Sequence, residues 1–333
     1  MNNSILEQNR EMEAFVIQAG ATRSFFFKDE FKPLAFIHLA DIGNQPIAAW
    51  NRMVEYLNYY KDYLAFAIHT GDYCGSSQLD YTDYYNDGTP AERPIYNCVG
   101  NHDTQKNNDW MKGGEGTWST QAESHALLFN RTENWDVNFI EGETPTAYYK
   151  DFPESNIRMI VLDPYFEVEA QKPWLASLLA EAREKGMHVM TAMHETTDTM
   201  PNRPDTTFNS YSNYEERFGT WPKTAYEDII ADFIDAGGQF ICNLAGHRHN
   251  DHFGYTARGV LNVAIECAGP WHLWTDARRP AGTRAYDCFN VVGVDTNLGL
   301  LKLIRIGNNS DNYMRRKGVL CYDYINKKVI FNG

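Results

Sequence analysis

QKPWLASLLAEAREKGMHVMTAMH, residues 171–194, combines a helix pattern with a strand pattern that follows it directly. The first half carries apolar side chains at intervals of three and four, at Trp174, Leu178, Leu179 and Ala182. Gly186 is of the residue type that most often ends a helix, and the apolar run after it stops at His194. The stretch therefore predicts a helix that returns into a buried strand, with an imidazole just beyond the strand.

Four other apolar, β-prone runs stop equally abruptly on a residue that can bind a metal ion. They are LAFIHLA (34–40) before Asp41, YLAFAIHTG (63–71) before Asp72, PIYNCVG (94–100) before Asn101, and FICNLAG (240–246) before His247, with His249 two residues later. In open α/β sheets, binding sites lie beyond the carboxyl ends of the strands, so five such endings can converge on one crevice. Because carboxylate, amide and imidazole groups are all metal ligands, the pattern predicts a metal centre at that edge.

The remainder of the chain predicts a layered α/β fold, because strand and helix patterns alternate from about residue 34 onward. Further helices are expected at 46–60 and 118–129, and strands at 146–152 and 157–163. After residue 249 we expect short strands that form a second sheet, which the tail of the chain completes, at 260–266, 286–294, 299–306, 318–323 and 328–331. We expect residues 1–30 to be a helical extension, with a helix at 4–19, and residues 31–333 to be one catalytic domain.

Composition excludes several classes of protein. A net charge of −14 without a basic cluster argues against nucleic acid as a dedicated partner. No apolar run approaches the ~18 to 20 residues of a membrane span. The six cysteines lack C-x-x-C spacing and are interpreted as reduced and buried. Charged residues in the first thirty positions interrupt a signal-peptide core, so the default compartment is the cytoplasm, or the periplasm or exterior if a signal peptide has been removed. The sequence specifies no oligomeric state.

Taken in order, the polar strand endings resemble the motifs of the calcineurin-like metallophosphoesterase superfamily. The matching pieces are ADIG at Asp41, Gly71-Asp72, GNHD at 100–103, AMHE at His194 and GHRH at 246–249, and the resemblance covers about residues 34–306. It implies a four-layer sandwich in which two mixed β-sheets are flanked by helices. It also implies a metal-dependent phosphoester hydrolase, a phosphatase or phosphodiesterase, that acts on a small phosphorylated substrate through a metal-bridging hydroxide.

The resemblance implies two divalent cations bridged by Asp72. One ion would be held by Asn101, His194 and His247, and the other by Asp41 and His249. A carboxylate has two oxygens and can hold two ions close together, which agrees with this assignment. The mixed ligand set suits manganese, iron, zinc, nickel or cobalt without choosing among them.

His102 corresponds to the catalytic histidine of the family, and Asp103 beside it is expected to orient its ring. A carboxylate hydrogen-bonded to one ring nitrogen raises the basicity of the other, which a proton donor to a leaving oxygen requires.

One position departs from the family pattern. Most relatives have D-x-H at the first aspartate, whereas Asp41 is followed by Ile42 and Gly43. The purple acid phosphatase branch has D-x-G with a tyrosine three residues after the bridging aspartate, but that position is Gly75 in this chain. The first metal position is left with Asp41, Asp72 and His249, plus water or a nearby side chain: Asn44, Gln45 or Tyr73.

Substrate contacts are expected from loops. The candidates are His252, His272, Arg278, Arg279 and Arg284, since arginine can clamp phosphate oxygens bidentately. The polar stretch 195–223 is the expected rim of the pocket, and His38 and His69 are interpreted as core or supporting histidines.

A different functional class remains open, a phosphoesterase-fold binding protein with little turnover because Gly43 replaces a ligand. A structural zinc site and a metal-dependent amidohydrolase fit less well, since the first favours cysteines and the second draws its H-x-H from an early strand.

Overall fold

The computed structural model describes residues 33–43, 47–75, 84–106, 117–129, 136–197, 223–247, 249, 251–269, 279–280, 286–308 and 318–332. The helix predicted at 4–19 lies outside these residues, so the division into an extension and one domain stays a prediction.

Within the described residues, the strands form two mixed seven-stranded sheets. The first has the order β14 (Lys328–Asn332), β13 (Val319–Asp323), β12 (Leu300–Gly307), β11 (Cys288–Asp295), β1 (Leu34–Leu39), β2 (Ala67–His69), β3 (Ile95–Asn97). The second has the order β4 (Asn138–Phe139), β5 (Tyr148–Phe152), β6 (Ile157–Val161), β7 (His188–Ala192), β8 (Gln239–Ala245), β10 (Leu261–Ala264), β9 (His252–Tyr255). Strands β1 to β3 are parallel, as are β6, β7, β8 and β10.

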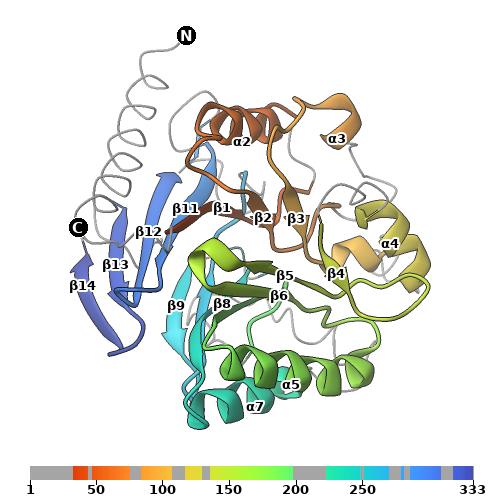
Figure 1. Ribbon diagram of the computed structural model, residues 1–333. Helices are drawn as coiled ribbons and strands as arrows, with labels where there is room; N and C mark the ends of the chain where they lie inside the picture. The colour runs from red at the N-terminus through yellow and green to blue at the C-terminus, as the bar shows by residue number, and fades with distance from the viewer. Residues whose placement is uncertain are drawn as a thin grey trace.

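Helices cover the outer faces of the sheets, which gives the four layers that the sequence predicts (Figure 1). Helices α2 (Ile47–Tyr59) and α3 (Tyr84–Asp87) lie on the side of the first sheet, and α5 (Val168–Glu184) and α7 (Lys223–Asp235) lie against the second (Figure 1). The part of the chain that the structure describes also contains α4 (Gln121–Phe129) and two 3-10 turns, η2 (His102–Thr104) and η5 (Pro153–Ser155). None of the helices among the described residues is long and apolar enough to cross a membrane.

The apolar core explains why the layers stack. Side chains of β1, β6 and β8, including Phe36, Met159 and Leu244, are buried in one cluster between the two sheets. A second cluster joins the other face of the second sheet to α5 and α7, through residues such as Leu179 and Ile230. Burying a large apolar side chain of this kind contributes about 1.5 to 3 kcal/mol, so the helix faces and the sheets hold one another in place.

Helix α5 confirms the pattern in residues 171–194. Its buried side chains are those with helical spacing, at Gln171, Leu175, Leu178, Leu179 and Ala182. Gly186 follows the helix with a φ of +65°, and the Met187 N–H bonds the Ala182 carbonyl, a helix ending that favours glycine. The chain then enters β7, whose last four residues are buried.

The tail of the chain differs from the expectation. Strands β11 to β14 do not build a second sheet: β11 pairs antiparallel with β1, so the tail extends the first sheet. Strands β9 and β10 join the second sheet. Which sheet a short strand joins depends on long-range pairing, which the local pattern does not carry. All six cysteines are free and five are buried, as expected.

Candidate metal centre

The five metal-binding endings lie two to four residues beyond the ends of five parallel strands, β1, β2, β3, β7 and β8. Contacts between the strand ends join the sheets at this edge: for example, the His194 Nδ1 atom lies 2.7 Å from the Thr70 carbonyl, and the His247 N–H donates to Asp41 Oδ2 at 3.0 Å. The carboxyl edges of both sheets therefore meet at one place, as the strand endings predict.

The backbone takes an uncommon conformation to turn these side chains inward. Asp41, Asp72, His247 and His249 all have φ between +52° and +67°, in the left-handed region. Each such residue costs of order 1 kcal/mol, and such residues gather at functional sites because the fold holds them there. Four of the six predicted ligands thus carry backbone strain of this kind.

Gly100 allows the strand ends to approach closely. A Cβ atom at this position would lie 2.1 Å from the Asp72 nitrogen and 2.3 Å from its Oδ1 atom. Any other residue would displace Asp72, so the glycine is needed to bring Asp72 next to the loop that carries Asn101.

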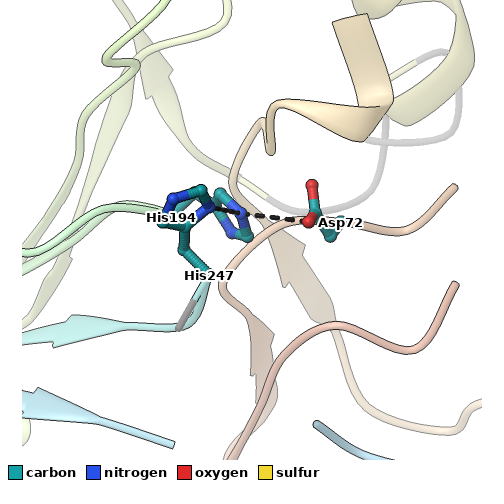
Figure 2. Close-up of side chains that lie close together, drawn as sticks. All are labelled: Asp72, His194 and His247. Carbon is teal, nitrogen blue, oxygen red and sulfur yellow. Dashed lines mark hydrogen bonds and ion pairs between the residues drawn. The ribbon is translucent and has the colours of Figure 1, made fainter. Parts of the chain in front are cut away.

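Four polar atoms converge at the candidate metal position of Asn101, His194 and His247. The Asn101 Oδ1 atom lies 3.1 Å from His194 Nε2 and 3.0 Å from His247 Nδ1. The two ring nitrogens are 3.2 Å apart, and His194 Nε2 is 3.2 Å from Asp72 Oδ2. Figure 2 shows the two imidazoles and the carboxylate turned toward one another. Ligands at about 2.1 Å from a common ion lie roughly 3.0 to 3.4 Å apart, so these separations fit one bound ion.

The partners of the two imidazoles indicate which nitrogen carries hydrogen. His194 Nδ1 faces a carbonyl, which only accepts, so Nε2 is left with a lone pair toward the cluster. The Glu195 carboxylate, 3.4 Å from His247 Nε2, favours hydrogen on that nitrogen, although the two groups form no hydrogen bond in this structure, and Nδ1 faces the same point as His194 Nε2. Two ring nitrogens this close repel each other unless a proton or a metal ion lies between them, and the donor set is suited to a divalent metal.

The pKa values of the side chains show the same demand for positive charge. Burial opposes a charged His194, but the Asp72 carboxylate outweighs it and raises the pKa of His194 to about 10. Burial alone would raise the pKa of Asp72, yet the neighbouring His194 and His102 imidazoles hold it well below the usual range. The same charges that retain a proton on His194 would favour a metal ion in its place.

The other candidate metal position comprises Asp41, Asp72 and His249, whose ligand atoms lie within 4.8 Å of one another. His249 Nε2 is 3.3 Å from Asp41 Oδ1, and the thiol of Cys267 hydrogen-bonds the His249 ring. Asp41 is buried, and among the described residues its Oδ1 atom makes no hydrogen bond. Asp72 belongs to both groups of ligands, which places it where a bridging carboxylate would be.

Gly43 cannot be replaced by a ligand in this backbone. A Cβ atom there would lie 2.1 Å from the Cys74 carbonyl oxygen and 2.6 Å from the Cα atom of Gly75. Tyr73 packs among aromatic rings, 5.4 Å between centroids from Trp50, and the other two candidate substitutes, Asn44 and Gln45, lie outside the described residues.

We expect the ion at the Asp41 and His249 position to be removed first by mild chelation, because this position has fewer protein ligands than the Asn101, His194 and His247 position. Stepwise chelation followed by metal counting would show one ion lost well before the other. Anomalous scattering from partly stripped crystals would locate the remaining ion beside His194. Two ions that leave together would contradict this expectation.

His102 lies beside the cluster without belonging to either ligand group. Its Nε2 atom is 3.8 Å from Asp72 Oδ2, and its Nδ1 atom is 3.1 Å from Gln105 Oε1. The expectation that Asp103 orients this ring is therefore corrected, because Gln105 takes that place. The Asp103 carboxylate instead accepts hydrogen bonds from the backbone N–H groups of Asp72, Cys74 and Gly100, and so fixes the loop that carries Asp72.

The predicted substrate contacts have different outcomes. Arg279 is buried, and its guanidinium donates to the carbonyls of Cys267, Ala268 and Tyr286, so the prediction that it clamps phosphate is corrected. His252 begins β9 beside Ala264, the last residue of β10, which keeps it at the edge where the ligands gather. His272, Arg278, Arg284 and most of the predicted rim, 198–222, lie outside the described residues.

The buried histidines behind the site agree with their interpretation. His38 and His69 are completely buried, and burial lowers the pKa of each to about 3. His38 Nε2 lies 3.1 Å from the hydroxyl of Thr70, the residue whose carbonyl faces His194. Both lie in the strands that lead to the ligands, His38 in β1 before Asp41 and His69 in β2 before Asp72.

Sequence reasoning missed three side chains that contact the candidate ligands or His102: Gln105, Glu195 and Cys267. Glu195 carried a weak signal, since it follows His194 directly in the AMHE motif. The other two carried none.

Comparison with known proteins identifies the fold. No protein-family model matches the sequence, and no curated protein matches it. Among solved structures, a dimetal phosphatase from Danio rerio matches with 12% identity and a TM-score of 0.50, over 83% of this chain and 96% of that chain. A phosphatase from Mycoplasma pneumoniae matches with 14% identity over 91% and 92%, with a TM-score of 0.37. Vacuolar protein sorting 29 from Cryptosporidium parvum matches with 10% identity over 87% and 96%, with a TM-score of 0.32. At these identities the likeness is one of fold, and the first structure alone carries it.

Proposed function

We propose that this chain, which has the metallophosphoesterase fold, is a metal-dependent phosphoester hydrolase with a binuclear centre. The observation that carries the proposal is that Asp72 belongs to two groups of converging ligand atoms at the joined edges of the sheets. The dimetal phosphatase from Danio rerio, which has the same fold, supports it.

Divalent ions held by these residues would lower the pKa of a bound water, which would supply the nucleophile, and would neutralise charge on the phosphoryl oxygens. The chain's own residues would do the rest. Asp72 and Asn101 would provide oxygen ligands, and His194 and His247 would provide nitrogen ligands. His102, whose ring lies beside Asp72 and is partly exposed, is placed to donate a proton to the departing oxygen.

Gln105 and Asp103 have separate supporting tasks in this proposal. Gln105 faces His102 Nδ1 and sets the orientation of the ring, while Asp103 fixes the turn that carries Asp72. Burial and the charge of the neighbouring Asp72 raise the pKa of Asp103 to about 7. Three backbone N–H groups donate to the Asp103 carboxyl group and keep it in place beside the Asp72 carboxylate.

A binding protein with little turnover is the second candidate, and the observation that favours it is the closed environment of Gly43, which leaves one metal position short of a ligand. Three protein ligands are nonetheless enough for a catalytic metal, so we favour the enzyme.

The two functions differ in a direct assay. We expect the protein to hydrolyse a chromogenic aryl phosphate, offered as monoester and as diester, at a rate that rises with added Mn²⁺ and falls after chelation. The ratio of the two rates would assign the phosphatase or phosphodiesterase class. A binding protein would retain the metal and show no metal-dependent rate on either ester.

A further inference from the structure

We propose that Glu195, held by Tyr165, is the positioning residue that sets the affinity of the metal position formed by Asn101, His194 and His247. The proposal rests on the function proposed above. It concerns a residue that neither the sequence motifs nor the comparisons assign.

The geometry places Glu195 directly behind a ligand. Its Oε2 atom lies 3.4 Å from His247 Nε2, while His247 Nδ1 faces Asn101 and His194 on the other side of the ring. The two atoms lie at ion-pair distance but do not meet hydrogen-bond geometry in this structure, and we expect the hydrogen bond to form when the ring is drawn onto an ion. Glu195, His247 and the ion position thus form a carboxylate–histidine–metal series.

The carboxylate is fixed from behind as well. Tyr165 donates its hydroxyl hydrogen to Glu195 Oε1 at 2.8 Å, and Asn243 donates to the Glu195 backbone carbonyl at 3.4 Å. Tyr165 itself is tied to the second sheet, because its N–H bonds the Asp163 carboxylate at 2.7 Å. Glu195 therefore cannot swing away from His247 without leaving buried groups unsatisfied.

Burial makes a purely structural role a poor explanation. Glu195 is only 2% exposed, and a buried carboxylate is costly unless opposite charge or hydrogen bonds compensate it. Glutamine would satisfy the Tyr165 hydroxyl equally well with no charge to bury. The negative charge of Glu195 is explained if the His247 ring binds a cation, because a carboxylate partner raises the basicity of the ring.

The three ligand histidines have chemically different partners. A neutral carbonyl lies behind His194 and a carboxylate lies behind His247, while a thiol interacts with the ring of His249. The negative charge of Glu195 is thus added to the position that already has more protein ligands. This asymmetry predicts one tight and one weak ion.

Titration with Co²⁺, whose visible absorption reports its coordination, tests the proposal in the purified metal-free chain. We expect the unaltered protein to bind in a tight step and a weak step. Glu195→Gln should raise the Kd of the tight step by about 10- to 100-fold and leave the weak step unchanged. The Tm of the metal-free protein should not fall, a result that a merely structural role would not give.

Two further variants make the result decisive. Tyr165→Phe should weaken the tight step in the same direction by a smaller factor, and it replaces Glu195→Gln if that variant does not fold. Asp295→Asn is the matched control, since it removes a carboxylate that is also buried but caps the turn after β11, and its Kd values should equal those of the parent.

The outcomes separate the two proposals. A tight step with unchanged Kd in both Glu195→Gln and Tyr165→Phe would overturn the role of Glu195 and leave the metal centre standing. A parent protein that binds no Co²⁺ would overturn the proposed function together with this inference.

Discussion

Replacing Asp72 by asparagine is expected to lower turnover by on the order of 10⁴-fold, together with the bound metal. Asp72 is the one side chain shared by the two ligand groups of the described residues. Asparagine keeps one acceptor oxygen, but its amide nitrogen carries hydrogens that repel a cation, and it brings no negative charge to offset two adjacent ions. Both positions should therefore weaken at once.

Metal counting after reconstitution and dialysis, combined with the aryl phosphate rate, measures this effect. Asp295→Asn is the matched control, because Asp295 is also a buried carboxylate but caps the turn after β11 and belongs to neither ligand group. The control should retain both ions and most of the activity. An Asp72→Asn protein that held two ions and turned over within tenfold of the parent would remove the shared carboxylate from the mechanism.

The positions of the metal-binding candidates could be predicted because the signal for each is local. An apolar run that stops at a polar residue marks a strand end, and parallel strands bring their ends to one edge. Asp41, Asp72, His194, His247 and His249 follow such runs, and the structure gathers all five into the two ligand groups. The prediction of these positions does not depend on how the chain connects one strand to the next.

The supporting contacts could not be predicted, because each depends on packing between segments that are distant in sequence. Glu195 contacts His247, which lies 52 positions away in the sequence. Tyr165 contacts Glu195 from another loop. Arg279 has the residue type of a phosphate clamp, but the carbonyls it holds become neighbours only after β10 and β11 are in place. Residue type alone indicates what a side chain can bind and not what it meets.

Gln105 and Asp103 show the same limit over a shorter distance. Asp103 is predicted to contact the His102 ring because the two residues are adjacent in sequence. The chain, however, forms a 3-10 turn from His102 to Thr104. The turn directs the Asp103 carboxylate to three backbone N–H groups and brings Gln105 beside the His102 ring. The local backbone conformation decides whether the residue one position or three positions after His102 meets its ring, and the residue types do not fix that conformation.

Replacing His102 by alanine is expected to lower turnover by about 10²- to 10⁴-fold while both ions remain bound. The ring lies next to the shared carboxylate, 3.8 Å from Asp72 Oδ2, and it belongs to neither ligand group. The backbone N–H of His102 donates to Asp72 Oδ1 at 2.9 Å, and alanine keeps this bond. The variant should therefore lose a proton donor without losing the position of Asp72.

The dependence on the leaving group distinguishes a proton donor from other roles. Nitrophenolate departs without a proton, whereas an alkoxide requires one, so His102→Ala should slow an alkyl phosphate far more than a nitrophenyl phosphate. His188→Ala is the control, because His188 lies at the opposite end of β7 from His194, about 20 Å away along an extended chain, and its rates should match the parent. Equal losses on both esters would show that the ring binds substrate instead of protonating it, and loss of metal would make His102 a ligand.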